Sequence, residues 1–257
     1  MTIRYINVRG LELGRGRVKL ICPVMSAGID GALETLALVR RSHADAVEYR
    51  ADWRADVRDA SRLLDDLRRI REALGDMPLL FTFRTAEEGG NMRLDAGEYA
   101  RLVRLAIDSG CIDMIDIEGR AGDTCAGELI AHAHAADVIA VYSCHDFARM
   151  PEEQWICDFI AHGRRLGADI PKCAALARGS GDMLTMLSAA ERMTRGADDG
   201  PVLAIAMGAD GVLSRLAGEF VGSCLTFCSL NGASAPGQLD CERAYDIVCR
   251  LHDCRAL

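Results

Sequence analysis

Short apolar runs alternate with longer segments of helical periodicity along almost the whole chain. The first such pair is an apolar run at 18–25, followed by apolar residues at helical spacing over 31–41. A buried strand needs only a few apolar residues in succession, whereas a helix that faces a core repeats them every three to four positions. The alternation therefore predicts repeated β–α units.

Eight strands and eight helices are predicted in this way. The further strands are expected at 46–50, 79–84, 114–118, 138–144, 169–174, 202–206 and 224–227. The further helices are expected at 59–74, 95–108, 124–135, 151–166, 180–194, 211–220 and 240–252. Eight β–α units in 257 residues are typical of an α/β fold, the closed (β/α)8 or TIM barrel.

An open, doubly wound sheet is the alternative architecture. It is disfavoured because no GxGxxG motif opens a helix after a strand and no GxxxxGK[ST] motif occurs. No shift in composition marks a domain boundary, so a single domain over 1–257 is predicted. Residues 1–17, with glycines at positions 10, 14 and 16, are left over and are expected to form a hairpin that closes the bottom of the barrel.

Composition and charge narrow the class of protein. Half of the residues are hydrophobic and 26% are charged, which favours a soluble globular chain over a disordered or fibrous one. A net charge of −8 disfavours nucleic acid or an anionic membrane as partner. The 11 cysteines form no CxxC pair and are expected to be buried thiols in a reducing compartment. With no signal peptide or membrane-spanning run recognised, a cytoplasmic location is expected.

Lysine is almost absent from the basic residues. Only Lys19 and Lys172 are lysine among 30 basic residues, and the other 28 are arginine. A guanidinium stays protonated, whereas a lysine amine can lose its proton and attack a carbonyl carbon. Lys172 lies in the largely apolar run 168–176. This placement is compatible with a snorkelling side chain and with a reactive amine.

Polar residues gather at the predicted carboxyl ends of the strands, where (β/α)8 barrels carry their catalytic groups. In chain order they are Glu48, Arg50, Asp52, Arg84, Glu87, Glu88, His145, Asp146, Lys172, Ser214, Arg215 and the loop 231–238. Each has an ordinary structural explanation: Glu48 and Arg50 share one face of a strand and could form an internal ion pair, and His145 could be a core histidine.

Their joint location favours a reaction instead. Arginines would bind the carboxylate of an acidic substrate, and the lysine would form a Schiff base with its ketone. The histidine would then move a proton beside the resulting iminium. This chemistry requires neither a metal ion nor a cofactor.

These segments resemble those of a known enzyme family. The residues that carry the likeness are EYRAD (48–52), FTFR (81–84) with EGG (88–90), SCHDF (143–147), GADIPK (167–172), SRLAG (214–218) and ASAPGQ (233–238). In this order, from about residue 18 to the C-terminus, they resemble type I 3-dehydroquinate dehydratase. The resemblance implies a (β/α)8 barrel, usually a homodimer, that converts 3-dehydroquinate to 3-dehydroshikimate in aromatic amino acid biosynthesis or quinate catabolism.

The resemblance also implies roles for single residues. Lys172 is expected to be the Schiff-base lysine, His145 the general acid and base, and Glu88 the carboxylate that orients the histidine. The ring hydroxyls of the substrate are expected to contact Glu48, Arg50 and Arg84. Its carboxylate is expected to contact Arg215, Ser234 and Gln238.

Two positions depart from the family pattern. Pro23 stands where many relatives have serine, and Ile205 where many have methionine near the lysine. Two other functions remain open on the sequence: a Schiff-base barrel of the class I aldolase kind acting on another keto acid, and a catalytically silent ligand-sensing barrel. The presence of both Lys172 and His145 disfavours the silent barrel.

Overall fold

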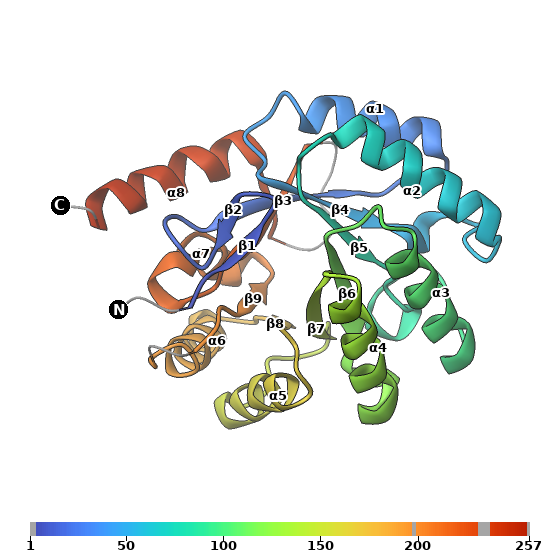
Figure 1. Ribbon diagram of the computed structural model, residues 1–257. Coiled ribbons are helices and arrows are strands. Elements are labelled where there is room, and N and C mark those ends of the chain that lie inside the picture. The colour runs from blue at the N-terminus through green and yellow to red at the C-terminus, as the bar shows by residue number, and fades with distance from the viewer. Residues whose placement is uncertain (1–3, 197–198, 231–236, 256–257) are drawn as a thin grey trace.

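The computed structural model describes residues 4–196, 199–230 and 237–255. Its central strands β3 to β9 follow one another in order and pair in parallel, and β10 pairs with β3. A parallel bridge between Val202 and Ser223 joins the β9 and β10 ends and closes the barrel. Figure 1 shows the helices as a ring outside the strands. The predicted (β/α)8 barrel is therefore confirmed, and the open doubly wound alternative is wrong.

The predicted strands and helices are present with small shifts at their ends. The barrel strands are β3 (Lys19–Val24), β4 (Ala46–Arg50), β5 (Leu79–Thr82), β6 (Met114–Glu118), β7 (Ile139–Asp146), β8 (Ile170–Leu176), β9 (Leu203–Met207) and β10 (Leu225–Ser229). The helices are α1 (Ile29–Val39), α2 (Ala60–Leu74), α3 (Ala96–Asp108), α4 (Asp123–Ala135), α5 (Glu153–Arg165), α6 (Ser180–Arg192), α7 (Val212–Leu216) and α8 (Cys241–Arg255). The short strand β11 (Leu239–Asp240) pairs with β10.

A hairpin seals one end of the barrel, as predicted. Its strands β1 (Ile6–Val8) and β2 (Leu11–Leu13) pair antiparallel, and Figure 1 shows them across one end of the barrel. Val8 and Leu13 are buried in the same apolar cluster as Ile21 and Met114, which lie on barrel strands. The hairpin therefore contributes to the interior of the barrel.

The strands divide their side chains between two apolar layers because successive residues of a strand point to opposite faces. On β5, Leu79 and Phe81 pack in the outer layer with the helices, whereas Leu80 packs inside the barrel. The helices present an apolar stripe to the outer layer, and α2 and α3 begin at side-chain caps. Asp95 and Glu98, for example, form a reciprocal capping box at the start of α3. This layering leaves the polar residues of the inner face at the carboxyl ends of the strands.

The helix predicted at 211–220 is divided in two. α7 ends at Leu216, and a 3-10 turn, η5 (Gly218–Val221), follows it. Gly218 is tightly packed: a Cβ there would be 2.8 Å from the carbonyl oxygen of Ser223, just before β10. The N–H of Ser223 also donates to the Gly218 carbonyl. A Cβ at position 218 would also lie 3.0 Å from Cγ2 of Val18, a tertiary contact that apolar spacing does not encode.

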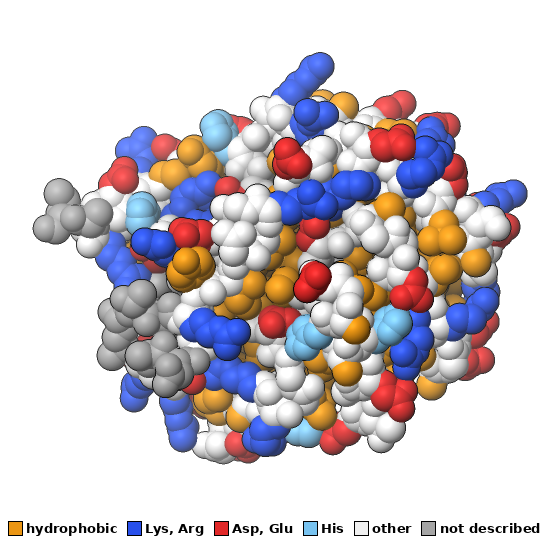
Figure 2. Space-filling view, in the orientation of Figure 1, with side chains coloured by type: hydrophobic (Ala, Val, Ile, Leu, Met, Phe, Trp, Pro, Cys, Tyr) orange, Lys and Arg blue, Asp and Glu red, His pale blue; other side chains and the backbone are white. Residues whose placement is uncertain are grey.

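The surface carries both signs of charge. Figure 2 shows basic and acidic side chains interspersed on the face that bears the hairpin. On α2, for example, Arg68 pairs with Asp65 and Glu72 of the same helix. Within the described ranges, no helix has the length and apolar character needed to cross a membrane.

Candidate active site

A cavity lies at the carboxyl ends of the strands, at the end of the barrel opposite the hairpin. Its lining residues are Glu48, Arg50, Arg84, Glu88, Gly89, His145, Phe147, Lys172, Ala174, Ile205, Met207, Arg215, Phe227 and Gln238. Every described residue to which the family resemblance assigns a role is among them. Ser234 lies outside the described residues.

Lys172 is buried at the centre of this cavity. The residue is 2% exposed, and its Nζ lies 2.9 Å from Asp116 Oδ2 and 4.0 Å from Glu48 Oε1. The face of the Phe227 ring lies 4.9 Å from the same nitrogen, measured to the ring centroid. A snorkelling side chain would carry its nitrogen out to water. The buried nitrogen excludes that explanation.

Asp116 joins Lys172 to a buried network of charges. It accepts hydrogen bonds from Arg84 Nη2 at 2.8 Å and from Ser143 Oγ at 2.6 Å. Burial acts to raise the pKa of Asp116, but the positive charges of Arg84 and Lys172 outweigh burial and lower the pKa to about 2. Asp116 is therefore ionised at neutral pH and balances two buried cations.

Arg84 connects this network to the histidine. Its Nη1 lies 2.8 Å from Glu118 Oε1 and 3.3 Å from Glu88 Oε2. Arg84 is 3% exposed, and the carboxylates of Glu118 and Asp116 balance this buried guanidinium. Because the same side chain contacts Asp116, Arg84 fixes the positions of the groups on both sides of the cavity.

Sequence reasoning missed Asp116, Glu118 and the hydrogen-bonding role of Ser143. A signal for the first two was present: the strand at 114–118 reads MIDIE, so both carboxylates share one face of an otherwise apolar strand. Two carboxylates on the inner face of a buried strand must be balanced by cations. That requirement could have indicated Arg84 and Lys172 as their partners.

Glu88 reaches the cavity through a tight turn. The residue ends the 3-10 turn η2 (Ala86–Glu88), and Gly89 follows it with a φ of 84°. At Gly90 a Cβ would lie 1.8 Å from the carbonyl oxygen of Arg84, so only glycine allows the chain to fold back there. The motif Glu-Gly-Gly thus places Glu88 Oε2 2.9 Å from Nδ1 of His145.

The environment of this pair favours its uncharged form. Burial lowers the pKa of His145 well below its usual range, and the nearby charges of Arg84, Lys172 and Arg50 lower it further. Burial likewise raises the pKa of Glu88 to about 8, with Arg84 opposing this rise. The imidazole is therefore neutral at neutral pH, which is the form that accepts a proton.

The remaining predicted contacts surround the same cavity. Arg50 forms a bidentate pair with Asp52, at 2.7 and 2.9 Å, and Glu48 accepts a hydrogen bond from Thr82. Arg215 is 2% exposed, and burial lowers its pKa to about 10. It remains a cation at neutral pH, in a setting where an anionic ligand would be strongly attracted.

Three candidates serve the local structure instead. Ser214 accepts a hydrogen bond from the N–H of Ala206 and donates one to the Gly211 carbonyl. Asp146 accepts backbone N–H bonds within its own turn. Glu87 pairs with Arg93 on the surface. None of the three lines the cavity.

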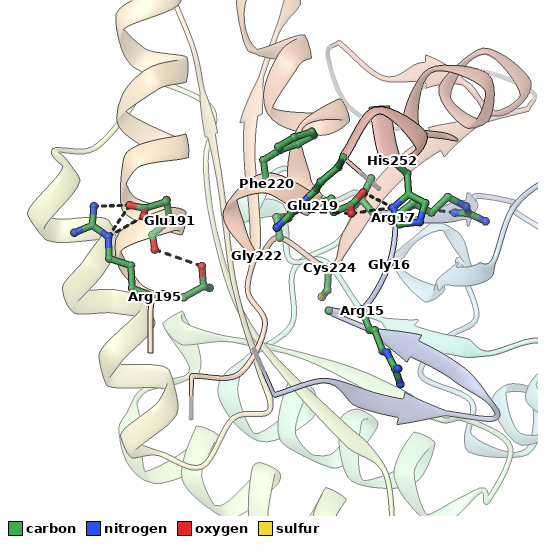
Figure 3. A pocket seen from close by; sticks show the side chains of 15 residues that line it. Arg15, Gly16, Arg17, Glu191, Arg195, Glu219, Phe220, Gly222, Cys224 and His252 are labelled. Atoms are coloured by element: carbon green, nitrogen blue, oxygen red, sulfur yellow. Dashed lines mark hydrogen bonds and ion pairs between the residues drawn. The ribbon is translucent and has the colours of Figure 1, made fainter. Parts of the chain in front are cut away.

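A larger cavity, of about 380 Å³, lies near the hairpin, where α6, η5 and α8 meet (Figure 3). The cavity that holds Lys172 is smaller, about 50 Å³. The charged groups around the larger cavity are largely engaged with each other or with neighbours: Arg195 pairs with Glu191, and His252 with Glu219 (Figure 3). Chemistry, and not volume, therefore identifies the site. The fold and this site define a (β/α)8-barrel enzyme with a buried lysine in its active site.

Comparison with known proteins identifies the family. Residues 20–252 match the family model of type I 3-dehydroquinase. The chain is 38% identical to the 3-dehydroquinate dehydratase of Salmonella typhimurium over 250 residues, 97% of this chain and 99% of the relative. The chain belongs to the type I 3-dehydroquinase family.

Solved structures agree with this assignment. The type I 3-dehydroquinate dehydratase of Clostridium difficile, solved with covalent modified comenic acid, has a TM-score of 0.94 and 31% identity, covering 99% of this chain and 100% of that chain. The 3-dehydroquinate dehydratase of Geobacillus kaustophilus has a TM-score of 0.93 and 31% identity, covering 97% of each chain.

Proposed function

We propose that this enzyme dehydrates 3-dehydroquinate to 3-dehydroshikimate through an imine between the substrate ketone and Lys172. Membership of the family assigns the chain 3-dehydroquinate dehydratase activity, a hydro-lyase reaction of the shikimate pathway. One observation carries the proposed mechanism: the buried Nζ of Lys172 shares its cavity with His145, which is bound to Glu88. The covalent modified comenic acid of the Clostridium difficile relative supports covalent chemistry in this family.

The proposed reaction proceeds in four steps. Lys172 passes its ammonium proton to His145, and the neutral amine adds to the C3 ketone. His145 then returns this proton to the carbinolamine hydroxyl, which leaves as water and gives the iminium. The iminium acidifies a proton on C2, which Nε2 of His145 removes. The protonated histidine then donates that proton to the departing C1 hydroxyl, so that water leaves by syn elimination. Water finally hydrolyses the product iminium and restores the amine.

Substrate binding is proposed to divide between two sets of residues. Arg215 and Gln238 bind the substrate carboxylate, with Ser234 assigned to the same role by family resemblance. Glu48, Arg50 and Arg84 contact the ring hydroxyls. Ile205, one of the two departures from the family pattern, lines the cavity, whereas Pro23 does not. Only side chains and water take part, so no cofactor or metal is proposed.

We further propose that the chain is a single domain, forms a homodimer and works in the cytoplasm. All 11 cysteines are free, which supports a reducing compartment. The unbroken run of strands from β3 to β10 supports a single domain. Light scattering on the purified protein should give twice the chain mass of 27.8 kDa. A mass of 27.8 kDa at micromolar concentration would contradict the dimer.

The mechanism is tested by trapping the imine. We expect sodium borohydride with 3-dehydroquinate to add a substrate-dependent mass to the intact protein, because reduction converts an imine into a stable secondary amine. With only two lysines in the chain, peptide mapping assigns the adduct to Lys172 or Lys19. In His145→Ala we expect slow turnover, on the order of 10²- to 10⁴-fold below wild type, and a persisting adduct.

His132→Ala is the matched control, because this histidine is paired with Asp108 on the surface. It should match wild type in turnover and in trapping. Failure of the wild-type protein to form an adduct with fresh substrate would refute the imine mechanism. Normal turnover of His145→Ala would remove His145 from the proton transfers.

A further inference from the structure

Phe227 makes a contact with the reactive nitrogen that the mechanism above does not use. The residue lies on β10 and is 8% exposed. Its ring centroid is 4.9 Å from Nζ of Lys172, with the nitrogen over the face of the ring. The face of an aromatic ring carries partial negative charge and attracts cations, most strongly where both groups are removed from water. This contact therefore favours positive charge on the lysine nitrogen.

Lys172 has other charged neighbours, but they act differently. Asp116 and Glu48 lie 2.9 and 4.0 Å from its Nζ. Both are carboxylates and can take a proton. The iminium of a lysine still carries one N–H, and loss of that proton gives a neutral imine that acidifies the adjacent carbon far less. An aromatic ring attracts the same charge but cannot remove the proton.

The surroundings of the ring strengthen its effect. Ile205, Met207 and Ala174 line the same cavity and are each less than 5% exposed. These apolar groups keep water from the ring face, so the attraction between ring and cation is weakly screened.

We propose that Phe227 is a catalytic residue whose ring face favours positive charge on the Lys172 nitrogen: it favours the ammonium in the free enzyme, which opposes release of the neutral amine, and it stabilises the iminium, which is the form that acidifies C2. The inference rests on the proposed imine mechanism for its second half. Its first half, the effect on the ammonium, concerns the free enzyme and does not depend on the substrate. The two halves can therefore be tested separately.

The experiment replaces Phe227 with phenylalanines carrying one, two and five ring fluorines. Fluorination withdraws electron density from the ring face and changes the shape of the side chain little. Lysine labelled with 13C at Cε gives only two signals in this chain, and Lys19→Arg assigns them. We expect the titration midpoint of the Lys172 signal to fall stepwise with each fluorine, by about one pH unit over the series. The fraction of enzyme trapped by borohydride at saturating 3-dehydroquinate should fall in the same order.

Phe83 provides the matched control. It is a fully buried phenylalanine in the outer apolar layer, against Tyr99, and does not line the cavity. The same fluorinated residues at position 83 should leave the Lys172 signal and the trapped fraction unchanged. Equal titration midpoints across the Phe227 series, with normal trapping, would overturn the proposal and leave the imine mechanism intact. A stepwise midpoint without any adduct would instead overturn the imine mechanism, and with it the proposed action on the iminium.

Discussion

Lys172→Ala is expected to lower kcat by roughly 10⁴-fold or more, because no other group in the described site can form the covalent intermediate. The fold should survive, since Arg84 still balances Asp116 after the ammonium is removed. Substrate binding should remain measurable by calorimetry, because the arginines that contact the substrate are unchanged. The measurement is steady-state production of 3-dehydroshikimate by its absorbance, with circular dichroism to confirm folding.

Two further variants distinguish the amine from its charge. Lys172→Arg keeps a cation at the same position but cannot form an imine, so we expect it to be as inactive as Lys172→Ala. Lys19→Arg changes the other lysine, which donates to the Arg15 carbonyl away from the active site, and should keep wild-type activity. Appreciable turnover in Lys172→Arg would show that only the positive charge of Lys172 matters.

Asp116→Asn is expected to lower the free energy of unfolding at pH 7 by about 2 to 3 kcal/mol. The amide has the shape of the protonated carboxyl, but it leaves the buried cations Lys172 and Arg84 short of one negative charge. The size of the effect follows from the pKa of Asp116, which is about 2 in the folded chain. Urea denaturation of both proteins at pH 7 measures the difference.

The difference should depend on pH in a defined direction. Because folding lowers the pKa of Asp116, the stabilisation is complete above about pH 4 and is lost as the pH falls towards 2. The gap between wild type and Asp116→Asn should therefore narrow over that range. Asp65→Asn is the control, since Asp65 pairs with Arg68 on the exposed face of α2 and should cost less than about 1 kcal/mol. A gap that stays constant down to pH 2 would refute the role given to Asp116.

The barrel could be predicted from the sequence because its information is local. The apolar periodicity of each segment predicts whether it is a strand or a helix. Eight such pairs in a chain of this length are compatible with few folds. The hairpin was predicted because residues 1–17 were left outside the eight β–α units. The split of the helix expected at 211–220 could not be predicted from apolar spacing, which does not reveal the local turn between Gly218 and Ser223 or the close packing of Gly218 against Val18.

The site followed the same division. The candidates were polar residues at the carboxyl ends of strands. Those to which the family resemblance assigns a role line one cavity where the structure describes them, whereas Asp52, Glu87, Asp146 and Ser214 do not line it. Asp116 and Phe227 were not predicted as site residues because they lie within strands, where the sequence does not distinguish a functional side chain from one that belongs to the core. Both residues matter because they lie close to Nζ of Lys172: Asp116 Oδ2 at 2.9 Å and the centroid of the Phe227 ring at 4.9 Å. Sequence spacing does not predict either distance.

The hairpin at the base of the barrel also restricts the route by which small molecules enter and leave. Val8 and Leu13 pack into the interior and close this end of the barrel, so that in the described part of the chain the active-site cavity lies at the opposite end. The product must leave by the opening through which the next substrate enters, and so must the water released on elimination. Substrate and product therefore cannot occupy the cavity together, and product that has not yet left competes with fresh substrate for entry.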